Sequence, residues 1–246
     1  MGTSKAYGGL KGKPTWSKLS RSVTCAVSSK NSTKQSAYAR VMSRASEHFR
    51  STASVNSGSV NSGGHAGIKV AQQVGAFIAN IQTSGFQSAL YHLSEGVNID
   101  DANQAINVII EKCANNAGIL DEVASKAAIK DLLEEIGEEA DTIDQFGEKF
   151  DKAVEDYGVE ELLFMYMGFY MYEHLCTNFY EKLIKQKGIT ETESFYQELK
   201  DYIVERTKTI YKQRDLRNID WNSQSGKELI EGILQDTLVA FESYES

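Results

Sequence analysis

Residues 162–172 of the chain read LLFMYMGFYMY, and this stretch decides the fold. It is the longest apolar stretch among the 246 residues, yet eleven residues are too few to cross a bilayer. A segment that is hydrophobic on all sides is typical of a helix in the middle of a protein core, surrounded by other helices. We therefore predict a long central helix from Val159 to about Lys187, ended by Gly188.

Apolar residues recur at helical spacing on both sides of this stretch. They predict helices over residues 36–50, from about 66 to Gly85, from Phe86 to Gly96, from Asp100 or Asp101 to Cys113, and over 129–136 with Gly137 as the left-handed residue after the helix. Two more helices follow the central one, where Thr190 with Glu193 and Ser225 with Glu228 have the spacing of capping boxes. The expected fold class is all-α, a multi-helix bundle with a flexible basic N-terminal tail.

The net charge of −8 is divided unevenly along the chain. Residues 1–70 contain eleven Lys or Arg and one acid, Glu47, a net charge of +10. Residues 71–246 contain fifteen bases and thirty-three acids, a net charge of −18. This division indicates either a basic arm that binds a polyanion or a basic segment that docks on an acidic body. We favour the second, because nucleic-acid readers usually carry their basic face on a globally basic domain.

The composition also predicts three regions. Residues 1–15, MGTSKAYGGLKGKPT, are rich in glycine and aperiodic, which predicts a flexible N-terminal tail. Residues 16–65 are expected to be a basic helical segment that ends in a Ser/Gly/Asn-rich linker. Residues 66–246 are expected to be the acidic helical body.

Motifs of catalysis and metal binding are missing from the sequence. It contains no phosphate-binding glycine loop, no nucleophile elbow and no zinc-ligand spacing. We therefore predict no catalytic residue, no metal ligand and no cofactor, and an interaction component rather than an enzyme. The three cysteines, Cys25, Cys113 and Cys176, are widely spaced, which is typical of a reducing compartment. Since there is also no stretch of signal-peptide type, we expect a cytoplasmic protein with no membrane segment.

The N-terminus offers one reactive group. Gly2 follows Met1, the context in which the initiator methionine is removed because the second residue is small. An exposed glycine α-amine has a pKa of about 7.7–8.0, so a usable fraction is neutral at pH 7 and can attack an activated acyl group. The alternative interpretation is an ordinary chain terminus with no chemical role.

The layout of the chain resembles that of the QatB family, whose members belong to four-component Qat anti-phage systems. The resemblance extends over nearly the full length and is sharpest in the short opening. It rests on Gly2-Thr3-Ser4 with Tyr7-Gly8-Gly9, on Pro14 and Trp16, on a basic amphipathic helix followed by a Ser/Gly stretch, and on an acidic helical body that ends in AFESYES. Family members often carry several prolines before the tryptophan, whereas this chain has only Pro14.

This resemblance implies partners and a modification. Qat systems also contain an ATPase, a QueC-like protein (QatC type) and a TatD-like nuclease. QueC-type enzymes adenylate 7-carboxy-7-deazaguanine and transfer its acyl group to ammonia, and a QueC-like defence protein is expected to transfer it to a protein amine instead. By this resemblance the acceptor is Gly2, which would carry a covalent 7-deazaguanine amide. The residues that the partner recognises and binds would be Thr3, Ser4, Tyr7, Gly8 and Gly9.

A second hypothesis is a nucleic-acid-binding accessory protein that uses a basic arm. Its candidate polyanion contacts are Lys11, Lys13, Arg40 and Arg44. Nucleic acid is not the favoured partner, because aromatic residues that stack on bases are few in this region and the acidic body repels phosphates.

Overall fold

The computed structural model describes residues 14–52, 65–114, 121–210, 214, 216 and 219–243. Within these ranges the chain is all-α and has no β-strand, which confirms the predicted fold class. The helices are α1 (Pro14–Ala26), the 3₁₀ helix η1 (Asn31–Thr33), α2 (Lys34–Thr52), α3 (His65–Ser84), α4 (Phe86–Leu93), α5 (Ala102–Ala114), α6 (Asp121–Ile136), α7 (Ile143–Lys187), α8 (Ile189–Thr207) and α9 (Gln224–Glu242). The predicted flexible tail and most of the predicted linker lie outside the described residues.

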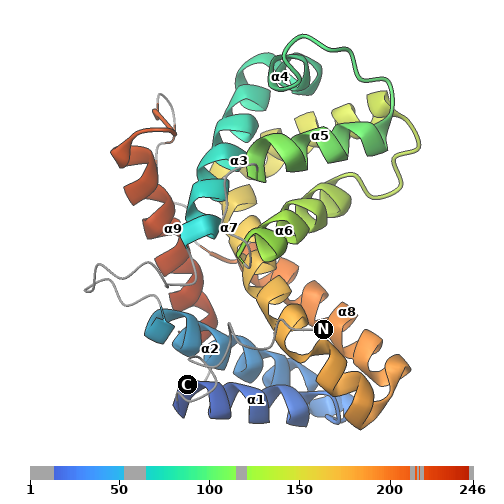
Figure 1. Ribbon diagram of the computed structural model, residues 1–246, viewed down its shortest axis with the longest axis vertical. Helices are drawn as coiled ribbons and strands as arrows, with labels where there is room; N and C mark the ends of the chain where they lie inside the picture. Colours follow the sequence, from blue (N-terminus) through green and yellow to red (C-terminus); the bar gives the residue numbers. More distant parts are fainter. Residues whose placement is uncertain are drawn as a thin grey trace, which may run out of the picture.

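Helix α7 is the axis around which the other helices pack. Every side chain of residues 162–172 is buried, so the predicted burial of the apolar stretch is confirmed. Helices α3, α6, α8 and α9 contact α7 along its length, and α8 lies against its C-terminal half (Figure 1). Helices α1 and α2 pack at the end of the molecule opposite α4 (Figure 1). No helix of the described ranges is long and apolar enough to span a membrane.

A break at Gly158 divides α7 into two halves. Gly158 has φ 74° and ψ 170°, a conformation that glycine adopts without the strain a Cβ atom brings. The predicted helix that begins at Val159 matches the second half and ends at Gly188, as expected. The division lets each half of α7 follow its own set of neighbouring helices.

The first half of α7 was missed by the sequence reasoning. Phe146 and Phe150 of this half are buried, and their ring centroids lie 5.5 and 5.3 Å from that of Phe86 in α4. The apolar residues here are separated by many acids and lysines, so the helical period is weak in the sequence. Contact with α4 and α6 supplies the apolar surroundings that the segment needs.

Gly137, predicted to be the left-handed residue after α6, has a different role in the structure. The helix ends at Ile136 as expected, but Glu139, not Gly137, adopts a positive φ of 62°. A Cβ atom on Gly137 would lie 2.3 Å from the ring of Phe146. The position therefore requires glycine because an aromatic ring packs directly on the backbone.

The predicted capping box of Thr190 and Glu193 is wrong. Helix α8 begins at Ile189, directly after the left-handed turn at Gly188, and has no side-chain cap. The hydroxyl of Thr192 instead donates to the carbonyl of Gly188 at 2.7 Å. The tight turn between α7 and α8 starts the second helix before Thr190 can cap it.

The predicted capping box of Ser225 and Glu228 is also wrong in position. Helix α9 is capped two residues earlier by Ser223, whose hydroxyl accepts a hydrogen bond from Gly226 N at 3.2 Å. Of the two aspartates expected at the start of α5, Asp101 caps the helix, since its Oδ1 accepts from Gln104 N at 2.9 Å. Spacing alone does not distinguish between serines two residues apart.

An ion-pair cluster connects the segment between α8 and α9 to the bundle. The guanidinium of Arg214 donates to Glu160 at 2.6 Å and also to Asp236 of α9. Glu160 is only 5% exposed and directly precedes the apolar stretch of α7. A carboxylate at this depth requires a charged partner, so Glu160 and Asp236 hold Arg214 between α7 and α9.

Replacing Gly168 with alanine should destabilise the protein. Its Cβ would lie 2.6 Å from Ile203 Cγ2 and 3.1 Å from Thr207 Cγ2, so α8 must move away from α7. Overpacking of this kind costs about 1–3 kcal/mol of unfolding free energy, measured by chemical denaturation.

The matched control is Gly232→Ala in α9, where the Cβ would approach only the Arg214 side chain, at 3.3 Å. Helix propensity should leave this variant as stable as the parent or up to about 1 kcal/mol more stable. Equal losses in both variants would contradict the role of Gly168 in close packing of α7 on α8.

Candidate functional site

The residues predicted to be modified or read by a partner lie outside the described residues, as do two of the predicted polyanion contacts. They are Gly2, Thr3, Ser4, Tyr7, Gly8, Gly9, Lys11 and Lys13. The structure describes the chain from Pro14 onward, the point at which this N-terminal segment joins the first helix. The candidate site that can be built from the structure is therefore the base of the N-terminal segment.

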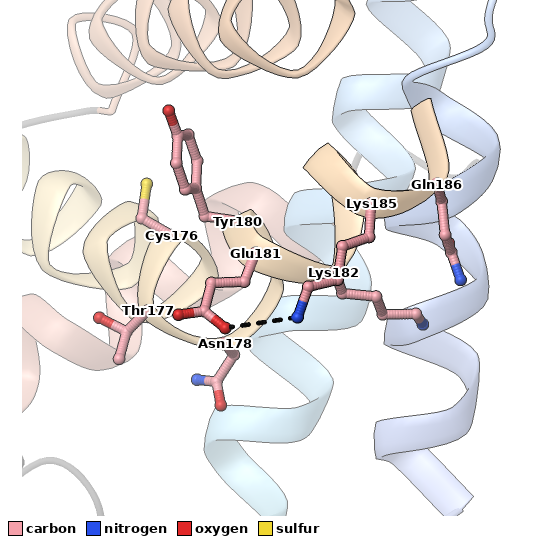
Figure 2. Close-up of a pocket in the computed structure, with 8 residues that line it drawn as sticks. All are labelled: Cys176, Thr177, Asn178, Tyr180, Glu181, Lys182, Lys185 and Gln186. Carbon is pink, nitrogen blue, oxygen red and sulfur yellow. Dashed lines mark ion pairs between the residues drawn. The ribbon is translucent and has the colours of Figure 1, made fainter. Parts of the chain in front are cut away.

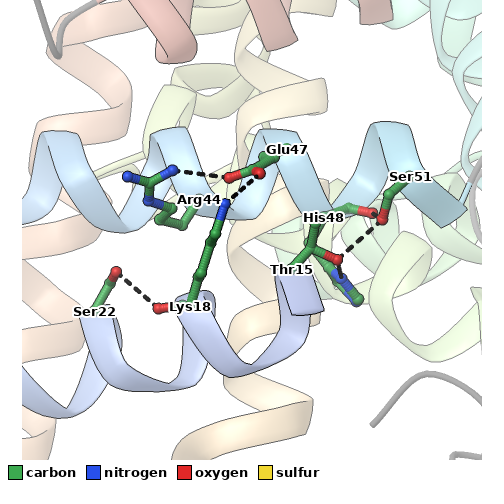
Figure 3. A network of polar contacts seen from close by, with 7 residues as sticks. All are labelled: Thr15, Lys18, Ser22, Arg44, Glu47, His48 and Ser51. Atoms are coloured by element: carbon green, nitrogen blue, oxygen red, sulfur yellow. Dashed lines mark hydrogen bonds and ion pairs between the residues drawn. The ribbon is translucent and has the colours of Figure 1, made fainter. Parts of the chain in front are cut away.

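A cluster of hydroxyl and imidazole groups holds the start of α1 against α2 (Figure 3). Thr15 Oγ1 lies 3.0 Å from His48 Nδ1 and 3.1 Å from Ser51 Oγ. Ser51 Oγ in turn donates to the carbonyl of His48 at 2.8 Å. His48 is 7% exposed and Thr15 and Ser51 are half-buried, so these bonds are partly shielded from water and hold the start of α1 on α2.

Trp16 anchors the same point to the central helix. Its ring stacks on Phe179 of α7 with a centroid distance of 5.0 Å and an interplanar angle of 20°. His48 lies against the same ring edge-on, at 5.5 Å. Offset stacking and edge contacts of this kind add to the energy of burial. The Trp16 side chain therefore ties α1, α2 and α7 together.

Glu47, the single acid of the basic segment, organises its cations (Figure 3). Its carboxylate accepts from Arg44 Nη1 at 2.9 Å and from Lys18 Nζ at 3.1 Å. The hydrogen bond from Arg44, followed by that from Lys18, lowers the pKa of Glu47. Of the two predicted polyanion contacts that the structure describes, Arg44 is thus paired on α2, and Arg40 is exposed one turn earlier.

Opposite charges also dock the basic segment on the acidic part of the chain. Lys34 Nζ lies 2.5 Å from Glu198 of α8, and the Tyr38 hydroxyl donates to the same carboxylate at 2.6 Å. The bond from Lys34 is the main cause that lowers the pKa of Glu198. At the other end of α2, Arg50 pairs with Glu242 of α9 at 3.0 Å. The division of the chain into the regions 16–65 and 66–246 remains a prediction, but α1 and α2 share one core with the other helices.

A half-buried pair of carboxyl groups, Asp131 of α6 and Glu173 of α7, lies farther along the bundle. Asp131 Oδ1 accepts from Lys200 Nζ at 2.9 Å, while Asp131 Oδ2 is buried and finds no donor among the described residues apart from the neighbouring Glu173 carboxyl. Burial and then the charge of Asp131 raise the pKa of Glu173 to about 8. The proton that Glu173 keeps at neutral pH is therefore placed to bridge the two carboxyl groups between α6, α7 and α8.

The polar clusters described above hold helices of the bundle against one another. Within the described ranges, no group of three or more His, Cys, Asp or Glu residues is arranged to hold a metal ion. The sequence reasoning missed Thr15, His48 and Glu198 as anchors, since single polar residues at unrelated positions carry no periodic signal. Glu47 differs from these residues, because the sequence does carry a signal for it. A single acid in a segment with a net charge of +10 is expected to pair with nearby cations.

Replacing Trp16 with alanine should loosen the base of the N-terminal segment. We expect the unfolding free energy to fall by about 2–3 kcal/mol. This is less than the loss for a fully buried aromatic ring, because Trp16 is only partly buried. Faster amide hydrogen exchange should appear in α1 first. Ser17→Ala, at an exposed position of the same helix, is the control and should change neither quantity. Unchanged exchange in α1 of the Trp16 variant would contradict the anchoring role.

Glu173→Gln should flatten the dependence of stability on pH. In the parent protein the unfolded chain loses this proton above about pH 4.5, while the folded chain keeps it to about pH 8. The contribution of Glu173 to stability is therefore fully present at low pH. It falls as the pH rises between these two values, by up to about 1.4 kcal/mol per pH unit.

Denaturation curves across this pH range test the effect. A glutamine can donate to Asp131 without titrating, so the variant should lose most of the slope; Glu135, whose pKa burial also raises, supplies the remainder. Glu134→Gln, an exposed neighbour on α6, should retain the slope of the parent. A Glu173 variant with an unchanged slope would show that this carboxyl group is ionised in the folded protein.

Comparison with known proteins identifies the family. A family model described as Qat anti-phage system associated protein QatB matches residues 56–241, which is more than half of the chain. The match covers α3 to α8 and nearly all of α9, and it leaves α1 and α2 outside. No curated protein and no solved structure matches the chain. The resemblance seen in the sequence is thus confirmed, and the chain belongs to the QatB family of proteins associated with the Qat anti-phage system.

Proposed function

We propose that this chain is a non-enzymatic interaction component of a Qat complex and the protein substrate of a QueC-like partner, which acylates Gly2 with a 7-deazaguanine. Membership of the QatB family makes the chain a component of a Qat anti-phage defence system with partners in that system. The proposed acylation of Gly2 is supported by the N-terminal sequence MGTSKAYGG in a chain of this family. The ATPase and the TatD-like nuclease of the same system are further proposed partners.

The proposed reaction is the formation of one amide bond. After removal of Met1, the neutral α-amine of Gly2 attacks the carbonyl carbon of adenylated 7-carboxy-7-deazaguanine. The bond from that carbon to the AMP oxygen breaks, AMP leaves, and the amine nitrogen loses one proton. A glycine suits this step because the amine has a pKa of about 7.7–8.0 and no side chain to obstruct its approach.

The anchored start of α1 determines how far the amine can reach. Gly2 lies twelve residues before Pro14, and a fully extended chain of this length spans about 40 Å. Thr3, Ser4, Tyr7, Gly8 and Gly9 lie in this span, where their backbone can bond along a narrow channel of the partner. The cluster of Thr15, Trp16 and His48 keeps the other end of the span on the bundle.

The imidazole of His48 supports a substrate role rather than a catalytic one. Its contacts with Thr15 and Ser51 bring a hydroxyl group and an imidazole together, as in some hydrolases. The imidazole is 7% exposed and covered by Trp16, so a substrate does not reach it. The cluster therefore serves to anchor α1.

Intact-mass measurement after co-expression with the QueC-like partner tests the proposal. The parent chain should lose Met1 and gain one 7-deazaguanine acyl group, and fragmentation should place that group on Gly2 rather than on Lys5 or Lys11. Gly2→Ala still permits removal of Met1 but adds a methyl group beside the amine, so modification should fall at least about tenfold.

Ala6→Ser is the matched control within the same segment and should be modified as well as the parent. A parent chain that has lost Met1 and carries no acyl group in the presence of an active partner would contradict the proposed modification. Co-purification with the QueC-like partner, measured separately, tests membership of the complex and does not depend on the modification.

A further inference from the structure

A pocket of about 570 Å³ opens on the outer face of α7, in its last three turns (Figure 2). Pockets of 300–1,000 Å³ are of a size to take small molecules or a few units of a chain. The lining groups that can bind a ligand belong to Asn178, Tyr180, Lys182, Lys185 and Gln186. None of them belongs to the cluster of Thr15, Trp16 and His48 described above.

The lining combines three kinds of group. Lys182 and Lys185 supply ammonium groups, and Asn178 and Gln186 supply amides. Tyr180 is 37% exposed, and its ring lies against that of Tyr196 in α8 at a centroid distance of 5.7 Å. Cations for phosphates, amides for base edges and an exposed aromatic ring for stacking are the groups by which proteins bind single-stranded nucleic acid.

One acid also lines this pocket. Glu181 lies 4.0 Å from Lys185, and the two side chains are 91% and 78% exposed. An ion pair at this distance and exposure is weak, so it leaves the ammonium group of Lys185 able to bind an anion. The pocket therefore keeps a positive charge despite Glu181.

Helix α1 extends the positive charge beside the pocket. Lys182 Nζ donates to Ser20 Oγ at 2.8 Å and Lys187 Nζ donates to Ser28 Oγ at 2.7 Å, which places α1 and the following turn against the end of α7. Residues 14–46 contain no acid. Arg21 directly follows Ser20, Lys30 lies two residues after Ser28, and both are exposed. We call Arg21, Lys30, Lys182, Lys185 and Lys187 the basic ridge.

The helix dipole accounts for only part of the basic ridge. Lysines in a last helical turn compensate the negative end of the dipole, and Lys185 and Lys187 occupy that turn of α7. The dipole does not explain why α1 brings further cations to the same place. Glu181 and Glu191, whose carboxylate lies beside Gly188, offset two of these five cations. In a chain of net charge −8, the positive charge that remains indicates a polyanionic ligand.

We infer that the pocket and the basic ridge bind single-stranded nucleic acid, with phosphates on the lysines and a base against Tyr180. A single strand offers unstacked bases, which the tyrosine ring requires, whereas a duplex hides them. A single strand also bends, so it can follow the basic ridge and avoid the acidic remainder of the molecule. This inference is independent of the acylation of Gly2, and its cations differ from Lys11, Lys13, Arg40 and Arg44, the contacts predicted from the sequence.

Fluorescence anisotropy with the purified full chain tests the inference. The probe is a dye-labelled oligothymidine of about 20 nucleotides, titrated at about 50 mM and about 200 mM salt. The parent should bind the probe, with lower affinity at higher salt, and should bind a duplex of equal length at least about fivefold more weakly. Absence of binding at low salt, or equal or tighter binding of the duplex, would overturn the inference.

Matched variants separate a specific site from general charge. Lys182→Gln with Lys185→Gln should weaken binding about tenfold or more and reduce its salt dependence, because two phosphate contacts are lost. Lys126→Gln with Lys130→Gln on α6 makes the same charge change away from the pocket and should weaken binding less than about threefold. Circular dichroism and thermal unfolding establish that both double variants are folded. Equal losses in the two would overturn the site.

Tyr180→Ala tests the stacking contact. Loss of one stacked base should weaken binding of the oligothymidine about fivefold or more, while the salt dependence stays that of the parent. Tyr91→Ala, another exposed tyrosine at 48%, is the control and should leave binding unchanged. An unaffected affinity in the Tyr180 variant would show that the surface attracts phosphate alone and would overturn the assignment to a nucleic acid base.

Discussion

The structure depends on the burial of one helical segment, residues 162–172 of α7, on all of its sides. No single neighbour can cover a segment of this kind, because each helix covers only one stripe of it. Removing this apolar surface from water therefore stabilises the packing of all the surrounding helices together. Close approach is required as well, and Gly168 allows α8 to pack directly on the α7 backbone. The break at Gly158 and the ion pairs of Arg214 then position the chain at the beginning of this segment.

The N-terminal helices join this core through both apolar and charged contacts. Trp16 stacks on α7, while Lys34 and Arg50 reach carboxylates of α8 and α9. The strong division of charge along the sequence is thus used within the molecule, where it brings α1 and α2 onto the bundle. Helix α1 occupies two positions of functional interest, since it begins where the N-terminal segment joins and its Arg21 belongs to the basic ridge.

Much of the fold was predictable because it depends on local periodicity. The stripes of α2 to α6, α8 and α9 lie at helical spacing, and the glycines after α3 and α7 break the helix by adopting positive φ. Predictions failed where a neighbour in space decided the outcome. Gly137 is required by the ring of Phe146, and the starts of α8 and α9 are set by the turns before them. The first half of α7 is stabilised mainly by contacts with other helices.

The sequence by itself determined the fold class and the family resemblance, and it predicted a reactive glycine near the N-terminus, because each follows from residues that are adjacent or regularly spaced. Tertiary structure alone decided which polar residues meet: Thr15 with His48, Lys34 with Glu198, Asp131 with Glu173 and Lys182 with Ser20. Such pairs join positions far apart in the chain, and their side chains look like ordinary surface residues in the sequence. Only the packing of helices around α7 brings them together, since distance in space, not order in the chain, controls electrostatic and hydrogen-bonding energy.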